Sequence, residues 1–248
     1  MMVIYVLWLR QLKRYLRSRA RVVGSLGQPL LFLLALGFGL GPVFRKAGEG
    51  SYLQFLAPGV VGMTVLFTAM FSGVELIWDR QFGFLKETLV APVPRIQIMI
   101  GRTLGGATVA TLQGLIVIVI ALAAGFRVTR YAHLPLALAF MLLMAVMFTA
   151  LGTAVASLLT DFQGFQLVMN FLVMPTFFLS GALFPLIGLP KLLAALAMLD
   201  PLSYGVDGLR AALIGASYFG MLLDFTVLCS LCIALFSVGG WLFSRIEL

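Results

Sequence analysis

The chain has 248 residues, of which 62% are hydrophobic and 10% are charged, and its mean hydropathy is +1.10. This composition excludes an ordinary soluble domain, in which about half of the residues are apolar and about a quarter are charged. Seventeen Lys and Arg against nine Asp and Glu give a net charge of +8. Because basic residues gather at the cytoplasmic ends of membrane helices, we attribute this charge to membrane topology and expect no nucleic acid partner.

The first 21 residues predict an amphipathic helix that lies at the inner surface of the membrane. Its basic residues recur at helical spacing, and Trp8, Leu12 and Tyr15 fall on the opposite face, where Arg19 is the exception. These basic residues are Arg10, Lys13, Arg14, Arg17 and Arg21. An apolar start that precedes the basic residues reverses the order of a signal peptide, so we expect this segment in the mature protein.

Six apolar runs are long enough to cross a hydrocarbon layer, which takes about 20 residues of helix. They are residues 22–41, 55–77, 103–124, 134–158, 165–187 and 222–243. An apolar piece at 192–199 is too short to span, and Pro190 and Pro201 flank it. The sequence therefore predicts an all-α integral membrane protein, a single transmembrane domain over 1–248, with short re-entrant or extracellular helices in an outer segment at 188–221.

The distribution of Lys and Arg predicts that both termini are cytoplasmic. With the N-terminus inside, eleven basic residues lie on the inner side and six on the outer side. The six in the N-terminal tail account for most of this bias. We expect a multi-pass protein of the cell membrane, the inner membrane where there are two.

Carboxylates are nearly absent from the predicted spans. Glu75, Asp79, Asp161 and Asp224 all fall near predicted helix ends. Carriers driven by protons or sodium ions usually keep a carboxylate near the middle of the membrane to hold the coupling ion. The energy for any transport is therefore expected from outside this chain.

No motif for ATP hydrolysis or other catalysis is present. None of the four lysines is followed by Ser or Thr, as a phosphate-binding P-loop requires, and a single histidine leaves little for acid–base chemistry. Cys229 and Cys232 lie in an apolar run, where two ligands do not make a metal site, and we interpret them as packing residues. We expect no catalytic residue, no metal and no cofactor in this chain.

The segment at 78–102 joins the second and third spans and mixes charged with apolar residues. Its apolar members are too numerous for a loop that contacts only water, so it is expected to dock on another protein or on the membrane surface. These members include Phe82, Phe84, Leu85, Leu89 and Val90.

This segment resembles the cytoplasmic loop of ABC transporter permeases of the type-2 export class. In that loop an Arg, a Gly and a Leu-rich turn precede Pro-x-x-Arg, and the matching residues here are Arg80, Gly83, Leu85, Leu89, Pro92 and Arg95. The family commonly has Leu-Glu after the turn, whereas Leu85 is followed here by Lys86 and then Glu87.

A second match lies in the outer segment. The stretches at 180–185, 189–190 and 200–210 look like the extracellular re-entrant segment of the drug-export branch of the same family. Its candidate residues are Pro185, Asp200, Pro201, Tyr204, Asp207 and Arg210. Asp207 and Arg210 are three residues apart, a spacing that allows a weak pair on one helix face, and we interpret them as residues that stabilise this outer segment.

The resemblance implies a permease that works as a dimer, with a second copy of itself or with a related chain. Each inner loop would present a coupling helix to a separate ATP-binding cassette subunit, which would hold ATP and Mg. The residues implied in this contact are Arg80, Gly83, Phe84, Leu85, Lys86 and Glu87, with Phe84 and Leu85 in an apolar groove of the partner and the charged residues at its rim. A helix that only lies on the lipid surface is the alternative.

Aromatic residues in two spans suggest a path for an amphiphilic substrate, such as a drug-like or lipid-like molecule in multidrug efflux. They are Phe67 and Phe71 in the second span and Phe171, Phe177 and Phe178 in the fifth. Side chains that merely pack or face lipid are the alternative. Two further functions stay open at this point, export of a lipid-linked polysaccharide and a membrane anchor that recruits a soluble partner without transport.

Overall fold

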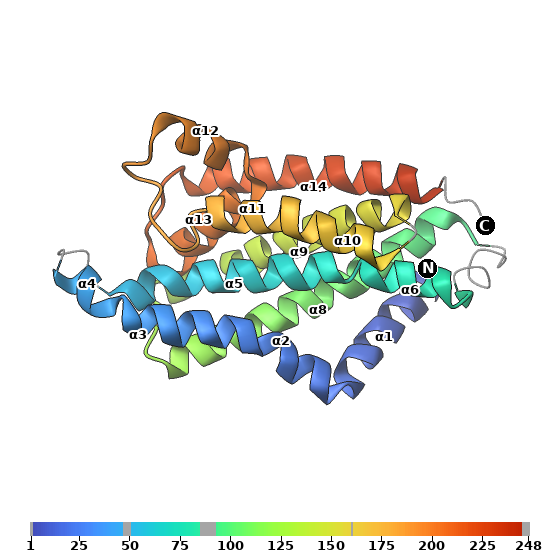
Figure 1. Ribbon diagram of the computed structural model, residues 1–248, viewed down its shortest axis with the longest axis horizontal. Coiled ribbons are helices and arrows are strands. Elements are labelled where there is room, and N and C mark those ends of the chain that lie inside the picture. Colours follow the sequence, from blue (N-terminus) through green and yellow to red (C-terminus); the bar gives the residue numbers. More distant parts are fainter. Residues whose placement is uncertain (1, 47–50, 85–92, 160, 245–248) are drawn as a thin grey trace.

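The computed structural model describes residues 2–46, 51–84, 93–159 and 161–244, and these ranges contain helices and no strand. The long helices run side by side along the longest axis of the molecule (Figure 1). The start of α1 (Met2–Arg17), α6 (Val74–Gln81) and the end of α14 (Met221–Ser244) lie at one end, which we call the coupling end. The opposite end carries α4 (Gly41–Lys46) and α12 (Lys191–Leu199).

Six helical segments are long and apolar enough to cross a membrane, as the sequence predicts. They are Val22–Gly39, Tyr52–Gln81, Arg95–Ala123, Tyr131–Leu158, Phe162–Leu179 and Met221–Phe243. All six differ from the expected bounds at one end or both, and two of them differ by eight residues at one end. The third starts at Arg95, eight residues before the predicted start, and the fifth ends at Leu179, eight residues before the predicted end. The expected loop at 78–102 is therefore shorter, because helices α6 and α8 (Arg95–Ala123) extend into it.

Two of the six segments contain a π-helical turn near a proline, where the regular hydrogen-bond ladder is interrupted. The first consists of α2 (Arg19–Leu31), η1 (Phe32–Leu36) and α3 (Gly37–Gly39), with Pro29 inside α2. The fifth consists of α10 (Phe162–Val168), η3 (Met169–Val173) and α11 (Met174–Leu179), with Pro175 in the first turn of α11. Both segments are mostly exposed on this chain, because only 17% and 22% of their apolar windows are buried.

The centre of the bundle is α5 (Tyr52–Phe71), whose segment is 78% buried, with α8 and α9 (Leu134–Leu158) packed against it. Glycines allow their backbones to touch. A Cβ atom on Gly73 would lie 2.3 Å from the carbonyl oxygen of Gly152, so a larger residue there must push the helices apart. Helix α14 packs on α9 and α13 (Pro201–Ile214) at the edge of the bundle and is only 11% buried.

The outer segment forms a bent pair of short helices. Helices α12 and α13 meet at an angle of 84°, and Asp200 stands at the bend. Its carboxylate accepts hydrogen bonds from the Leu202 amide at 2.9 Å and the Ser203 hydroxyl at 3.3 Å, while Pro201 occupies the first helical position. Asp followed by Pro is a strong helix start, since the carboxylate caps free amides and the proline ring preforms the backbone.

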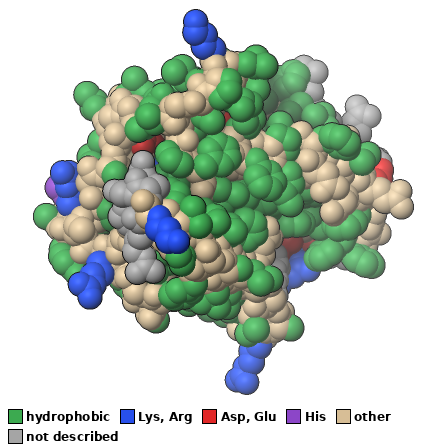
Figure 2. Space-filling model, turned by 60° about the vertical axis from the view of Figure 1, so that its left-hand side comes forward, with side chains coloured by type: hydrophobic (Ala, Val, Ile, Leu, Met, Phe, Trp, Pro, Cys, Tyr) green, Lys and Arg blue, Asp and Glu red, His purple; other side chains and the backbone are tan. Residues whose placement is uncertain are grey.

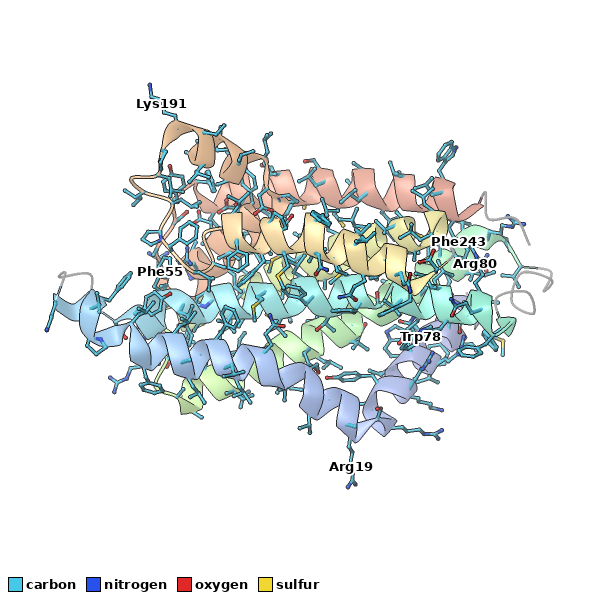
Figure 3. The ribbon with its side chains drawn as sticks, in the orientation of Figure 1. Arg19, Phe55, Trp78, Arg80, Lys191 and Phe243 are labelled. Carbon is cyan, nitrogen blue, oxygen red and sulfur yellow. The ribbon has the colours of Figure 1, made fainter. Side chains whose placement is uncertain are left out.

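The N-terminal helix ends at Arg17 and not at residue 21, and Ser18 separates it from α2. The two helices form a V (Figure 1), and Arg19 at its tip points away from the bundle (Figure 3). Helix α1 packs closely on α8 through two glycines. A Cβ atom on Gly101 would lie 2.9 Å from the Leu7 Cβ atom, and one on Gly105 would lie 2.6 Å from the Gln11 Oε1 atom. This helix is therefore part of the bundle as well as amphipathic.

The surface of the molecule fits a lipid environment. Hydrophobic side chains cover much of the face seen in Figure 2, and basic side chains project at a few places on its rim. Exposed apolar residues also occur on all six membrane-spanning segments, for example Val23, Phe71, Val119 and Phe171. Such a surface is unfavourable in water and favourable in hydrocarbon.

Candidate transport and coupling sites

A cavity of about 510 Å³ lies beside the V of α1 and α2, toward the coupling end of the bundle. Helices α1, α2, α5, α6, α8 and α10 all contribute to its wall. The lining residues are Tyr15, Ala20, Gly24, Ser25, Gln28, Pro29, Met63, Thr64, Phe67, Thr68, Phe71, Val74, Glu75, Trp78, Val109 and Phe162. A cavity of this volume can hold a drug-sized molecule or part of a lipid.

One part of the wall is aromatic. Phe71, Trp78 and Phe162 are each about 40% exposed, so a molecule outside the chain can reach them. Phe67 is partly buried, and its ring packs edge-on against Phe177 at a centroid distance of 6.1 Å. Aromatic side chains offer broad apolar contact area, which suits an acyl chain or a fused ring system.

The five phenylalanines predicted for the substrate path separate into three groups. Phe67 and Phe71 line the cavity. Phe177 does not reach it, because it is 1% exposed and packs between Phe67 and Phe32. Phe171 and Phe178 are 78% and 48% exposed and are not among the lining residues, so they lie on the outside of this chain.

Another part of the wall is polar. Ser25, Gln28, Thr64 and Thr68 add hydroxyl and amide groups, and Glu75 is the charged residue among those that line the cavity. The Thr64 hydroxyl donates to the Val60 carbonyl at 2.8 Å, so it is satisfied within its own helix and costs little to bury. Together the two parts give the cavity an amphiphilic lining.

Five charged side chains form a partly buried cluster between the cavity and the coupling end. Arg102 and Arg10 both bond Asp79, Arg10 at 3.3 Å, and Arg14 lies 4.0 Å from Glu75. Glu75 and Asp79 are 6% and 7% exposed as whole residues, and Arg102 is 5% exposed. Buried charges are costly unless they are paired, so this cluster fixes α1, α6 and α8 relative to one another.

The cluster was not predicted, because Glu75 and Asp79 were expected only to stand near helix ends. A signal for it is present in the sequence. Glu75 and Asp79 are four residues apart, as are Arg10 and Arg14, so each pair lies on one face of its helix. Two such faces of opposite charge are complementary, and the structure pairs them in antiparallel order.

Three of the predicted coupling residues, Arg80, Gly83 and Phe84, lie in the last turn of α6 or directly after it. The Arg80 guanidinium donates to the Leu159 carbonyl at 2.9 Å, which ties α6 to the end of α9. Gly83 has a φ of +78°, a backbone conformation that is unfavourable for residues other than glycine. The ring of Phe84 is 36% exposed and lies 3.8 Å from the Arg10 guanidinium carbon. The predicted contact residues Leu85, Lys86 and Glu87 lie outside the described residues.

The structure does not form the ion pair that the spacing of Asp207 and Arg210 allows. Asp207 accepts hydrogen bonds from the Ser217 hydroxyl at 3.0 Å and from the amides of Tyr218 and Phe219 at 2.8 and 2.9 Å. Its carboxylate therefore binds the turn between α13 and α14 and does not bind Arg210. Within the described ranges, no ion pair joins Asp207 and Arg210.

Arg210 instead bridges three elements at the outer end. Its guanidinium donates to the carbonyls of Gly181 at 3.0 Å and Phe55 at 3.3 Å, and its carbon lies 4.0 Å from the centroid of the Phe55 ring. Tyr204 donates to the Met198 carbonyl at 2.7 Å and stacks on Phe219. The Arg210 contacts hold α13 to α5, and the Tyr204 hydrogen bond holds α13 to α12. Pro185 lies in the connection between α11 and α12.

The chain was compared with known proteins. Residues 2–214 match the family model of the ABC-2 type transporter. Nodulation protein J of Rhizobium leguminosarum bv. trifolii is 32% identical over 198 residues, which cover 79% of this chain and 75% of the relative. The inner membrane transport permease YadH of Escherichia coli is 26% identical over 242 residues, covering 96% and 93%.

A third relative is the transport permease ycf38 of Cyanophora paradoxa, which is 28% identical over 214 residues, 84% of this chain and 72% of the relative. The family model and the all-helical bundle with six candidate spans agree. The chain therefore belongs to the ABC-2 type transporter family, as a multi-pass permease subunit.

Proposed function

We propose that this permease exports an amphiphilic molecule, drug-like or lipid-like, with energy from a separate ATP-binding cassette subunit that holds ATP and Mg. The observation that carries the proposal is the cavity beside α1 and α2. Its aromatic residues would contact the apolar part of the molecule, and its hydroxyl and amide groups would contact the polar part. Phe67 and Phe71 are the members of the predicted path that we assign to this contact.

A lipid that carries a sugar head group is a second candidate substrate. The spans contain few polar residues, yet Ser25, Gln28, Thr64 and Thr68 meet in the wall of this one cavity. Hydroxyl and amide side chains can exchange hydrogen bonds with sugar hydroxyls. Their placement beside an apolar wall favours a molecule that combines a sugar with an alkyl chain.

The proposal includes a dimer. The two spans that border the cavity, α2 to α3 and α10 to α11, bury only 17% and 22% of their apolar windows on this chain. A second copy, or a related permease, would cover them and would close the cavity from the outside. Phe171 and Phe178, exposed on the fifth span, would then lie in or near this contact.

The coupling end is assigned to the cytoplasm, and both termini with it. The start of α1 lies at this end, α1 carries Arg10, Lys13, Arg14 and Arg17, and an excess of basic residues marks the cytoplasmic side. Phe84 is the described residue of the coupling segment that would enter an apolar groove of the ATPase, together with Leu85. Arg80, Gly83, Lys86 and Glu87 would complete this contact.

A binding experiment tests the cavity. In a variant with Trp8 and Trp241 replaced by Phe, Trp78 is the remaining tryptophan and reports on the cavity wall. Brominated dodecyl maltoside and a brominated alkyl trimethylammonium of equal chain length should quench the Trp78 fluorescence, and the quenching should saturate as the probe concentration rises. The first probe carries a sugar and the second a cation, so their relative affinities separate the two candidate substrates.

Control variants complete the experiment. Phe67→Ala should lower the affinity for either probe at least about tenfold, since burying an aromatic ring contributes on the order of 1.5–3 kcal/mol. Tyr131→Ala, on an exposed aromatic residue outside the cavity wall and outside the proposed dimer contact, should leave the affinity unchanged. Equal effects of the two changes, or quenching that never saturates, would refute the cavity as a binding site and would favour a non-transporting anchor.

A further inference from the structure

Gln113 on α8 joins the two arms of the V through hydrogen bonds. The Tyr15 hydroxyl on α1 donates to its Oε1 atom, and its Nε2 atom donates to the Ser25 hydroxyl on α2 at 2.5 Å. Ser25 in turn donates to the Val22 carbonyl at 3.0 Å. Every donor in this chain of bonds has an acceptor, so the three side chains form one directed network.

The position of Gln113 makes the network costly to break. Its side chain is fully buried and Tyr15 is 3% exposed, so neither group can replace a lost partner with bulk water. An amide at this place would be unfavourable in a membrane helix without both partners. We therefore look for a role of Gln113 that depends on its hydrogen bonds and that an apolar residue of equal volume could not fulfil.

We propose that Gln113 is a positioning residue that fixes the angle between α1 and α2. Ser18 separates the two helices, so the backbone alone does not hold them in line, and Gln113 contacts both sides of this break. Tyr15 and Ser25 line the cavity, as does Val109 one helical turn before Gln113 on α8. The angle between α1 and α2 therefore also determines where this wall of the cavity lies.

The same helix connects this wall to the coupling segment. Arg10 lies five residues before Tyr15 on α1, bonds Asp79 and rests on the ring of Phe84. A displacement of Phe84 can thus reach Tyr15 through little more than one turn of helix. This part of the inference rests on the proposed function, whereas the role of Gln113 in the V does not.

Distances between spin labels test the role of Gln113. With Cys229 and Cys232 replaced by Ser, labels are placed at Val6→Cys on α1 and Leu31→Cys on α2, both exposed positions and both more than eight residues from the break at Ser18. The full chain is measured in nanodiscs by double electron–electron resonance, diluted with unlabelled protein. Gln113→Met, which keeps the volume and removes both hydrogen bonds, should broaden the distribution and shift it to longer distances.

Matched variants keep the test decisive. Thr111→Val removes a buried hydroxyl that donates to the Ala107 carbonyl of its own helix, so its distribution should equal that of the unchanged chain. Tyr15→Phe and Ser25→Ala each break one of the two bonds, and they serve if Gln113→Met does not fold. Both should broaden the distribution.

One result overturns the inference, namely equal distributions for the unchanged chain and for the Gln113, Tyr15 and Ser25 variants. Quenching of Trp78 by brominated dodecyl maltoside is recorded on the same variants without spin labels, with Trp8 and Trp241 replaced by Phe. Absence of quenching in all of them, with the distances shifted as expected, would refute the proposed function and leave the role of Gln113 supported.

Discussion

Asp79 holds the charge cluster together, and its removal should destabilise the bundle more than removal of any cation that it binds. Asp79→Leu leaves Arg102 charged in a site where its side chain is 6% exposed. It also deprives Arg10 of a partner, but the Arg10 side chain is 34% exposed and can turn to water. The two cations therefore contribute unequally to the cost.

The burial of each partner sets the expected magnitudes. Leaving a buried charge without its partner costs about 3–5 kcal/mol, whereas losing a partly exposed ion pair costs about 0.2–1 kcal/mol. Asp79→Leu should thus lower the free energy of unfolding by roughly 4–5 kcal/mol, and Arg10→Met by about 1 kcal/mol at most. The double change Asp79→Leu with Arg102→Met should recover most of the loss, since an apolar pair of similar volume can replace a buried ion pair at little cost.

The assay is equilibrium unfolding of the purified chain in mixed micelles, followed by circular dichroism. The order expected for the loss of stability is Asp79→Leu, then Arg102→Met, then Arg10→Met. An Asp79→Leu variant that is no less stable than Arg10→Met would refute the reasoning from burial. So would a double variant that is as unstable as Asp79→Leu alone.

Three further outcomes follow from the topology, the coupling segment and the packing of α1. In a chain without native cysteines, Cys at Lys86 should resist an impermeant thiol reagent added to intact cells and Cys at Lys46 should react; labelling at Lys86 would contradict the orientation. Phe84→Asp should abolish copurification of the ATPase while membrane insertion persists, because a charge in an apolar groove costs several kcal/mol, and undiminished copurification would exclude this docking residue. Gly101→Ala should destabilise the chain by about 1–3 kcal/mol through overpacking against α1, whereas Gly24→Ala, with open space around it, should not; thermal unfolding curves compare the two.

The sequence was sufficient to predict the membrane class and the number of spans, because the length and hydropathy of a helix are set by the thickness of the bilayer. The sequence was less informative where the backbone conformation determines the end of a helix. The fifth span ends at Leu179, and Gly181 with a φ of +69° follows it, although the apolar run continues to residue 187. Hydropathy alone does not register such an end.

The candidate site was only partly predictable, since it depends on contacts between distant segments. Phe67 and Phe71 were expected to face a substrate, and both line the cavity. The hydrogen bonds that join α1, α2 and α8 beside this cavity were missed, because Gln113 meets Tyr15 and Ser25 across 98 and 88 residues of sequence. Periodicity places a residue on a face of its helix and does not say which helix that face meets.

The burial of two carboxylates also bears on the source of energy. The sequence predicts Glu75 and Asp224 near the ends of their spans. In the structure each stands in the first turn of a helix, and Glu75 is 6% exposed while Asp224 is fully buried. Buried carboxylates within a membrane protein are typical of proton and ion pathways. The two carboxylates therefore point to the alternative that an experiment must distinguish from an ATP-driven mechanism, namely transport driven by a proton or ion gradient.

Reconstituted transport decides between these sources of energy. The chain alone, in proteoliposomes with a proton or sodium gradient, should move no fluorescent dodecyl-chain amphiphile uphill and should hydrolyse no ATP. Addition of its ATP-binding cassette subunit, ATP and Mg should start movement of the amphiphile. Accumulation driven by a gradient in the chain alone, and lost on Glu75→Gln or Asp224→Asn, would contradict the account and identify a secondary transporter.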